Sequence, residues 1–231
     1  MKSSFPAIRF IFDCERDLQN IYDACTISPK WGNDFSKSLN PQLIKIAQGK
    51  SFSECRKELE VSRKEIYDSP LIPSFLKAIE GIWHFLAKDY FTRLERVTGR
   101  TVFHHEITCY LTTVPKCPYN PREYSFMINF FDSLPGNLRT IGHEVFHLQF
   151  HEFFFEELKN KIGIEQTHIL KESLTTLLNL EFKDLWLVKD RGYPEHQSLR
   201  NFIEETWSKE KKFDMLLVKC AHYIKNERGS N

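Results

Sequence analysis

The segment His143-Glu144-Val145-Phe146-His147 places two imidazoles four residues apart. On a helix, residues at this spacing lie about 40° apart around the axis and about 6 Å apart along it, so both rings can reach one metal ion from the same side. Glu144 points roughly 100° away from His143 and can reach a metal-bound water without binding the ion itself. This is the His-Glu-x-x-His pattern of zinc hydrolases, and it predicts a zinc site.

The residues around this motif predict a helix that is buried on most of its circumference. No Lys, Arg or Asp occurs between Thr140 and His151. A buried glutamate beside two histidines is costly unless something compensates its charge, and a divalent cation is the simplest compensation. An internal His–Glu hydrogen-bond cluster without metal is the alternative. Apolar residues lie on two sides of the helical period, one formed by Leu138, Ile141, Val145 and Leu148 and the other by Phe146 and Phe150.

Zinc in a hydrolytic site usually has three protein ligands and one open position, so the two histidines need a companion. His151 is a poor candidate, because three consecutive turns of one helix cannot converge on one ion. We expect it to line the cleft, to support the ligands or to face solvent. Glu172 lies 25 residues after His147, a distance that lets the chain turn and place a second helix antiparallel to the first. His168 and Glu165, on the same polar face, are the alternative third ligands.

Sequence periodicity predicts the elements that lead into the motif. Residues 103–111 and then 124–132 alternate between two faces, which predicts two strands separated by a loop with three prolines. The helix that carries the motif is expected to begin at Asp132 or Ser133, either of which can cap it, because Pro135 fits only in a first turn.

The rest of the chain has mainly helical patterns. Ser51 and Glu54 form a capping-box pattern at the start of one helix, and Gly99 is the expected stop of a long amphipathic one. Helices are therefore predicted over 55–67, 72–98 and 164–182, with a loop over 153–163.

Two strands, a helix with His143-Glu144-x-x-His147 and a following helix with Glu172 together resemble the zincin metallopeptidases of the gluzincin type. The minigluzincins are nearest in size, and the similarity to thermolysin is distant. The resemblance covers about residues 101–182. It implies zinc held by His143, His147 and Glu172, with Glu144 as the catalytic base that takes a proton from zinc-bound water as this attacks a peptide bond. It also implies that the second predicted strand is an exposed edge with which an extended substrate pairs.

Two features of the family have no direct counterpart here. Many gluzincins carry an Asp four residues after the glutamate ligand, where it hydrogen-bonds the first histidine. This chain has Thr176 at that position, and Asn179 is the candidate that orients the ring instead. The family usually stabilises the oxyanion with Tyr or His, for which Tyr193 and His196 are the candidates; their alternative interpretation is as ordinary loop residues.

Composition limits the remaining classes of function. The 231 residues are 41% hydrophobic and 27% charged, which is enough apolar surface for a core of catalytic size and excludes disorder as the dominant state. A net charge of +1 gives no general attraction to nucleic acid or to anionic membranes, so neither is an expected partner. The apolar stretch Phe5–Phe12 is interrupted by Arg9 and is neither an export signal nor a membrane span.

The six cysteines are far apart, so we expect reduced thiols in a cytoplasmic protein. A disulfide or a metal clip between Cys109 and Cys117 is the alternative.

We predict an α+β fold in which residues 100–231 form a zincin-like metallopeptidase domain with a small antiparallel or mixed sheet, the motif helix and the glutamate-ligand helix. Residues 1–99 are expected to form a mainly helical extension packed on this core. The predicted partner is a peptide or protein substrate. The alternative function is a catalytically silent or latent zincin-like protein with a regulatory or partner-binding role, in which Cys109, Cys117 or the polar tail over 225–231 occupies the open zinc position.

Overall fold

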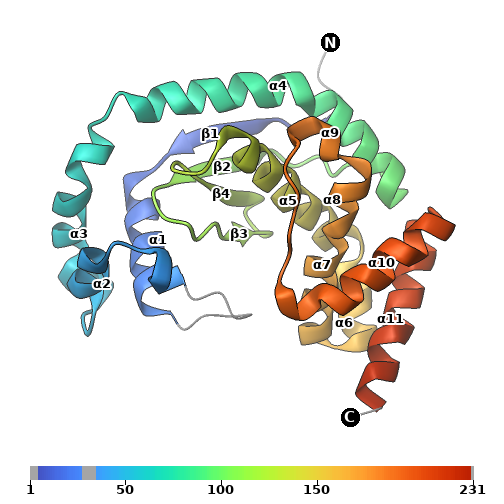
Figure 1. The fold of residues 1–231 in the computed structure, drawn as a ribbon. Coiled ribbons are helices and arrows are strands. Elements are labelled where there is room, and N and C mark those ends of the chain that lie inside the picture. The colour runs from blue at the N-terminus through green and yellow to red at the C-terminus, as the bar shows by residue number, and fades with distance from the viewer. Residues whose placement is uncertain (1–4, 28–34, 230–231) are drawn as a thin grey trace. The chain divides into compact units, whose positions relative to one another are not determined.

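The structure is a computed structural model that describes residues 5–27 and 35–229 (Figure 1). The chain divides into two compact units. The first, here called the site unit, consists of the described residues of Met1–Pro6, Phe85–His105 and Leu138–Asn231. The second, the sheet unit, consists of those of Ala7–His84 and Glu106–Asn137. The boundary predicted at residue 99 therefore falls inside the site unit.

The sheet unit contains a mixed four-stranded sheet with the strand order β1-β2-β4-β3. Its strands are β1 (Ile8–Phe12), β2 (Ile107–Thr112), β4 (Ser125–Asn129) and β3 (Tyr119–Asn120). The first two pairs are parallel and the β3–β4 pair is antiparallel. The predicted α+β class with a small mixed sheet is confirmed.

Three details of the strand prediction were wrong. Strand β1 lies in the region expected to be mainly helical, and its apolar residues do not alternate because Ile11 and Phe12 are adjacent. The strand expected from residue 103 begins only at Ile107, since the backbone N–H of Phe103 donates to the Gln149 side chain (3.3 Å) and is not in the ladder. Strand β4 is not an edge, because β3, confined between Pro118 and Pro121, pairs with Ser125 and Phe126.

The helices of the sheet unit are α1 (Cys14–Thr26), η1 (Phe35–Ser38), α2 (Pro41–Ala47), α3 (Phe52–Tyr67) and the first part of α4 (Leu71–Thr98). Two of these helices, α1 and α3, meet at a buried carboxylate. Asp17 on α1 is fully buried and accepts hydrogen bonds from Tyr67 Oη (2.8 Å) and from the side chains of Thr112 and Thr113 (2.7 Å each). This network ties α1 to α3 and to the end of β2. The predicted cap of α3 is confirmed, because Glu54 accepts from the Ser51 backbone (2.7 Å).

Two helices begin in the sheet unit and end in the site unit. Helix α4 stops as predicted at Gly99, whose φ of 64° is in the left-handed region. Helix α5 spans Leu134–Phe153, and the Ser133 hydroxyl accepts from the Gly136 backbone (3.1 Å), which confirms Ser133 as its cap.

The remaining helices lie in the site unit. Residues 155–162, expected as loop, form α6, because Phe155, Leu158 and Ile162 give it a buried face. The helix expected over 164–182 is interrupted at Thr175 into two helices. The elements after α6 are α7 (Ile164–Leu174), α8 (Thr176–Glu181), α9 (Lys183–Trp186), η2 (Pro194–His196), α10 (Gln197–Lys209) and α11 (Phe213–Gly229). Among the described residues, no helix has the length and apolarity that crossing a membrane requires.

Candidate metal centre

Helix α5 places the two motif histidines on one side, in contact with each other. Their ring centroids are 4.3 Å apart and the ring planes are inclined by 73°. The helix is held from behind at Gly142, whose carbonyl accepts from Tyr90 Oη (2.6 Å). A Cβ at Gly142 would lie 2.6 Å from Trp186 Cη2, so the tight packing against Trp186 requires glycine beside the first histidine.

Helix α7 brings Glu172 to the same point. Its Oε2 lies 3.6 Å from His143 Nε2 and 3.3 Å from His147 Nε2. One ligand atom from each of these three residues lies within 4.8 Å of the other two. Tetrahedral zinc ligands at about 2.1 Å from the ion are roughly 3.4 Å from one another, which is close to both of these separations. The structure thus brings His143, His147 and Glu172 together, as predicted.

The hydrogen bond at Nδ1 of His143 determines whether Nε2 of the same ring can bind a metal ion. Nδ1 donates to Asp190 Oδ2 (2.7 Å), so in a neutral ring Nε2 carries the lone pair and faces the Glu172 carboxylate. Two electron-rich atoms directed at each other require a cation between them, either a proton or a metal ion.

The charges in the site agree with this requirement. Burial opposes the charged form of His143, but Asp190 and Glu172 outweigh burial and raise its pKa to about 10. Burial and the nearby Lys171 lower the pKa of His147 to about 3, which keeps that ring neutral and able to bind a metal. Burial would raise the pKa of Glu172, but the charge of Lys171 and the hydrogen bonds from the two histidines hold it well below its ordinary value. Without metal, the chain therefore places a proton on His143 where a metal ion fits.

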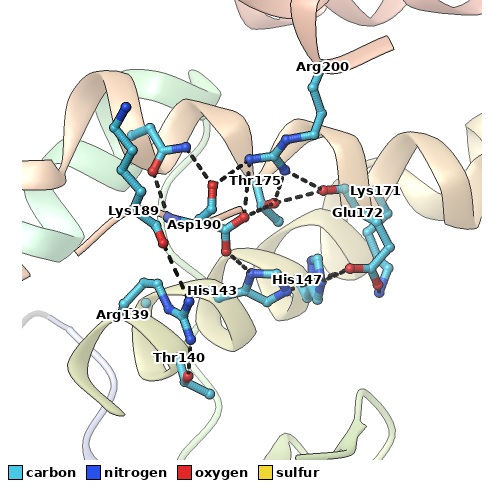
Figure 2. A network of polar contacts seen from close by, with 12 residues as sticks. Arg139, Thr140, His143, His147, Lys171, Glu172, Thr175, Lys189, Asp190 and Arg200 are labelled. Carbon is cyan, nitrogen blue, oxygen red and sulfur yellow. Dashed lines mark hydrogen bonds and ion pairs between the residues drawn. The ribbon is translucent and has the colours of Figure 1, made fainter. Parts of the chain in front are cut away.

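Asp190 and Arg200 form a buried ion pair behind the first histidine (Figure 2). Asp190 Oδ1 accepts from Arg200 Nη2 (3.2 Å), and the same guanidinium nitrogen donates to the Asp190 backbone carbonyl (2.8 Å). Arg200 Nη1 donates to Thr175 Oγ1 (2.9 Å), at the break between α7 and α8. Burial opposes the charge of Asp190, yet His143 and Arg200 hold its pKa below the ordinary value. The pair therefore fixes the orientation of the His143 ring.

The residue that orients His143 was wrongly predicted. Asn179 does not contact the histidine; its side chain donates to the backbone carbonyl of Asp190 and accepts from the backbone N–H of Asp190 (2.8 Å each). Asn179 thus positions Asp190, and Asp190 is the residue that orients the His143 ring. The Thr176 hydroxyl donates a hydrogen bond to the Glu204 carboxylate.

Gly192 allows Arg200 to pack under this loop. Its φ is 61°, and a Cβ there would lie 2.5 Å from Arg200 Nη1. Glycine is therefore required both by the backbone conformation and by the close approach of the guanidinium.

Glu144, the predicted base, is 6% exposed and is not a member of the ligand group. No described residue gives its Oε2 a hydrogen-bond partner. Burial raises the pKa of Glu144 to about 7, with His143 and Lys171 opposing part of that increase. A carboxylate with a pKa near neutrality can both accept and release a proton under ordinary conditions.

Several other candidates lie outside the ligand group. His151 stacks on Phe155 with ring centroids 4.2 Å apart, and His168 contacts the same ring from α7 (5.1 Å). Glu165 is exposed. The group that could hold a metal among the described residues consists of His143, His147 and Glu172, and His151 is not part of it.

The two candidates for stabilising an oxyanion lie together at η2. Tyr193 and His196 have ring centroids 5.3 Å apart, and His196 is buried. Burial lowers the pKa of His196, and the charge of Glu172 acts on it in the opposite sense. Their role in stabilising an oxyanion stays a prediction.

The structure pairs no cysteines and continues the last helix into the polar tail. None of the six cysteines, all of which lie in the described part of the chain, forms a disulfide, so no such bond joins Cys109 to Cys117. Residues 225–229 belong to α11, and residues 230–231 lie outside the described part of the chain. The part of the polar tail over 225–229 is thus helical.

Three residues of the site were missed in the sequence: Lys171, Asp190 and Arg200. Asp190 lies 43 residues after His147 in an irregular segment, and Arg200 follows on α10, so no helical spacing links them to the motif. Gly192 was the available signal, since a glycine in a charged loop can indicate a left-handed or crowded position. Comparisons with family models, with curated proteins and with solved structures find no match to this chain.

Proposed function

We propose that this chain is a zinc-dependent metallopeptidase that hydrolyses peptide bonds. The observation that carries the proposal is the convergence of His143 Nε2 and His147 Nε2 on one oxygen of Glu172. The residues fit zinc, because two neutral imidazoles and one carboxylate are a common ligand set of hydrolytic zinc sites. The carboxylate of Glu144, buried and outside the ligand set, is available for proton transfer.

Each side chain has a separate task in this proposal. A zinc ion held by His143, His147 and Glu172 would act as a Lewis acid toward a water molecule and toward the substrate carbonyl. Glu144 takes a proton from the water as its oxygen attacks the carbonyl carbon, and returns that proton to the leaving nitrogen. Asp190 keeps the hydrogen on His143 Nδ1, so that Nε2 stays available as a ligand.

The choice of peptide bonds is supported by the resemblance of the motif and of Glu172 to the gluzincins. It receives no support from β4, which is an inner strand and has only part of its backbone available to a substrate.

Low exposure favours a second candidate, a latent or catalytically silent zincin-like protein. The side chains of His147 and Glu172 are only 1% and 13% exposed. Both candidates require zinc, and they differ in turnover.

A variant of the base distinguishes the two candidates. Glu144→Gln removes the proton acceptor and preserves the shape of the side chain, so it should retain zinc and lose cleavage of a broad peptide library by on the order of a hundredfold or more. Glu165→Gln, on the exposed start of α7, is the matched control and should cleave like the wild type. Zinc-loaded wild type that cleaves no peptide would support the silent protein and contradict the peptidase.

A further inference from the structure

Lys171 is a buried cation directly beside the ligand set. Its side chain is 2% exposed, and Nζ donates to Glu172 Oε1 at 2.6 Å. Consecutive residues of a helix point about 100° apart and do not normally contact each other. The lysine side chain must therefore bend to reach its neighbour. Burial of its charge costs free energy, which the contact with the Glu172 carboxylate has to compensate.

The two oxygens of Glu172 are divided between different partners. Oε1 accepts from Lys171, and Oε2 faces both imidazoles, at 3.3 Å from His147 Nε2 and 3.6 Å from His143 Nε2. A carboxylate can bind zinc through one oxygen or through both. An ammonium group on Oε1 favours binding through Oε2 alone.

We propose that Lys171 is a positioning residue of the metal centre, which makes Glu172 a ligand through one oxygen and so keeps a coordination position open for water and substrate. This inference rests on the proposed function for its metal. Catalytic zinc sites keep such a position open, and a Glu172 bound through both oxygens would fill it.

The charge of Lys171 has a second consequence. With an ordinary zinc–oxygen distance and the observed hydrogen bond, Nζ would be roughly 5 Å from a bound ion and would repel a divalent cation. Removing the ammonium should therefore tighten zinc binding, and freeing Oε1 to bind the ion acts in the same direction. If Lys171 had a merely structural role, its removal would disturb the site and weaken zinc binding instead.

The test uses Lys171→Met in the full-length protein, with Lys209→Met as control. Lys209 is an exposed lysine on α10 that is paired with Glu205, so its loss should leave the centre unchanged. For Lys171→Met we expect the zinc Kd, measured by competition with a coloured chelator, to fall by one to two orders of magnitude. Peptide turnover should fall at least tenfold in the same protein.

Cobalt substitution reads the coordination directly. The visible absorption of Co²⁺ is strong at four ligands and weaker at five, so Lys171→Met should show reduced absorptivity while wild type and Lys209→Met keep the strong bands. Lys171→Arg retains the charge and should restore the wild-type spectrum at least in part. Weaker zinc binding or an unchanged cobalt spectrum in a folded Lys171→Met protein would overturn the inference. The zinc affinity and the cobalt spectrum do not depend on whether the wild type cleaves peptides. Peptide cleavage by the wild type tests the proposed function separately.

A measurement on the wild type covers the case in which Lys171→Met does not fold. In crystals of the zinc-loaded protein, Glu172 Oε2 should lie about 2.0–2.2 Å from the ion, with Oε1 on Lys171 and out of bonding range. Two equal zinc–oxygen distances to Glu172 would overturn the proposal.

Discussion

Asp190→Asn is the sharpest perturbation of the site that leaves the three metal ligands in place. The wild-type carboxylate accepts from His143 Nδ1 through one oxygen (2.7 Å) and from Arg200 Nη2 through the other (3.2 Å). Asparagine has one oxygen, so its amide group must face one of these two donors. The variant therefore loses a hydrogen bond, gains a contact between two donors and leaves Arg200 without its buried counter-charge.

The magnitude follows from burial. The side chains of Asp190 and Arg200 are 6% and 3% exposed, and breaking one partner of a buried ion pair costs about 3–5 kcal/mol. Arg200 keeps its bonds to Thr175 and to the Asp190 carbonyl, so the lower end, about 3 kcal/mol, is expected for the metal-free protein. Loss of the carboxylate on His143 should weaken zinc binding by about 10- to 100-fold.

Urea unfolding in the presence of chelator measures the first effect, and competition with a chelator measures the second. Asp184→Asn is the matched control, because Asp184 pairs with Arg93 in the same unit while being 60% exposed, and its loss should cost less than about 1 kcal/mol. Equal destabilisation by the two variants, or unchanged zinc affinity in Asp190→Asn, would refute the reasoning.

Three further predictions follow from the same geometry. Because the folded-state pKa of Glu144 is raised to about 7, its stabilising contribution is present below about pH 4.5 and lost as pH rises through 7. Metal-free wild type should therefore lose up to about 3 kcal/mol relative to Glu144→Gln between pH 4 and 8 in urea titrations, and parallel profiles would contradict this. Gly142→Ala should lower the unfolding free energy by about 1–3 kcal/mol through its clash with Trp186, whereas Gly81→Ala, in open space on α4, should raise it by up to about 1 kcal/mol; the opposite order in thermal melts would count against the packing. Chelation should lower the Tm of wild type and leave that of His147→Ala unchanged, and an unaffected wild type would argue against a bound ion.

The site was predictable where its residues obey helical spacing. His143 and His147 are one turn apart, so local periodicity was sufficient to pair them. Glu172 came from its distance of 25 residues after His147 and from the resemblance to the gluzincins, while His168 and Glu165 stayed open as alternatives. Asp190 and Arg200 were not accessible in this way, because their contacts depend on where an irregular loop returns to α7. Lys171 was missed for a different reason, since a lysine beside a glutamate on a helix ordinarily faces solvent.

The fold shows the same division between local and long-range information. The caps of α3 and α5, Ser51 and Ser133, were predicted correctly because cap signals are local, although α3 begins at Phe52 and not at the predicted residue 55. Strand β1 was missed, since its pairing partner β2 lies about 100 residues away and only Phe10 of the strand is buried. Helix α6 was mistaken for a loop because the segment is short and follows α5 almost directly.

The zinc content of the purified chain tests the metal centre most directly. Protein purified without chelators should contain one zinc ion per chain by elemental analysis, and His147→Ala, which removes one of the three ligands, should contain almost none at equal concentration. The exposed His84→Ala on α4 should match the wild type. A well-folded wild type that carries no zinc and takes up none on dialysis against it would contradict the proposed centre.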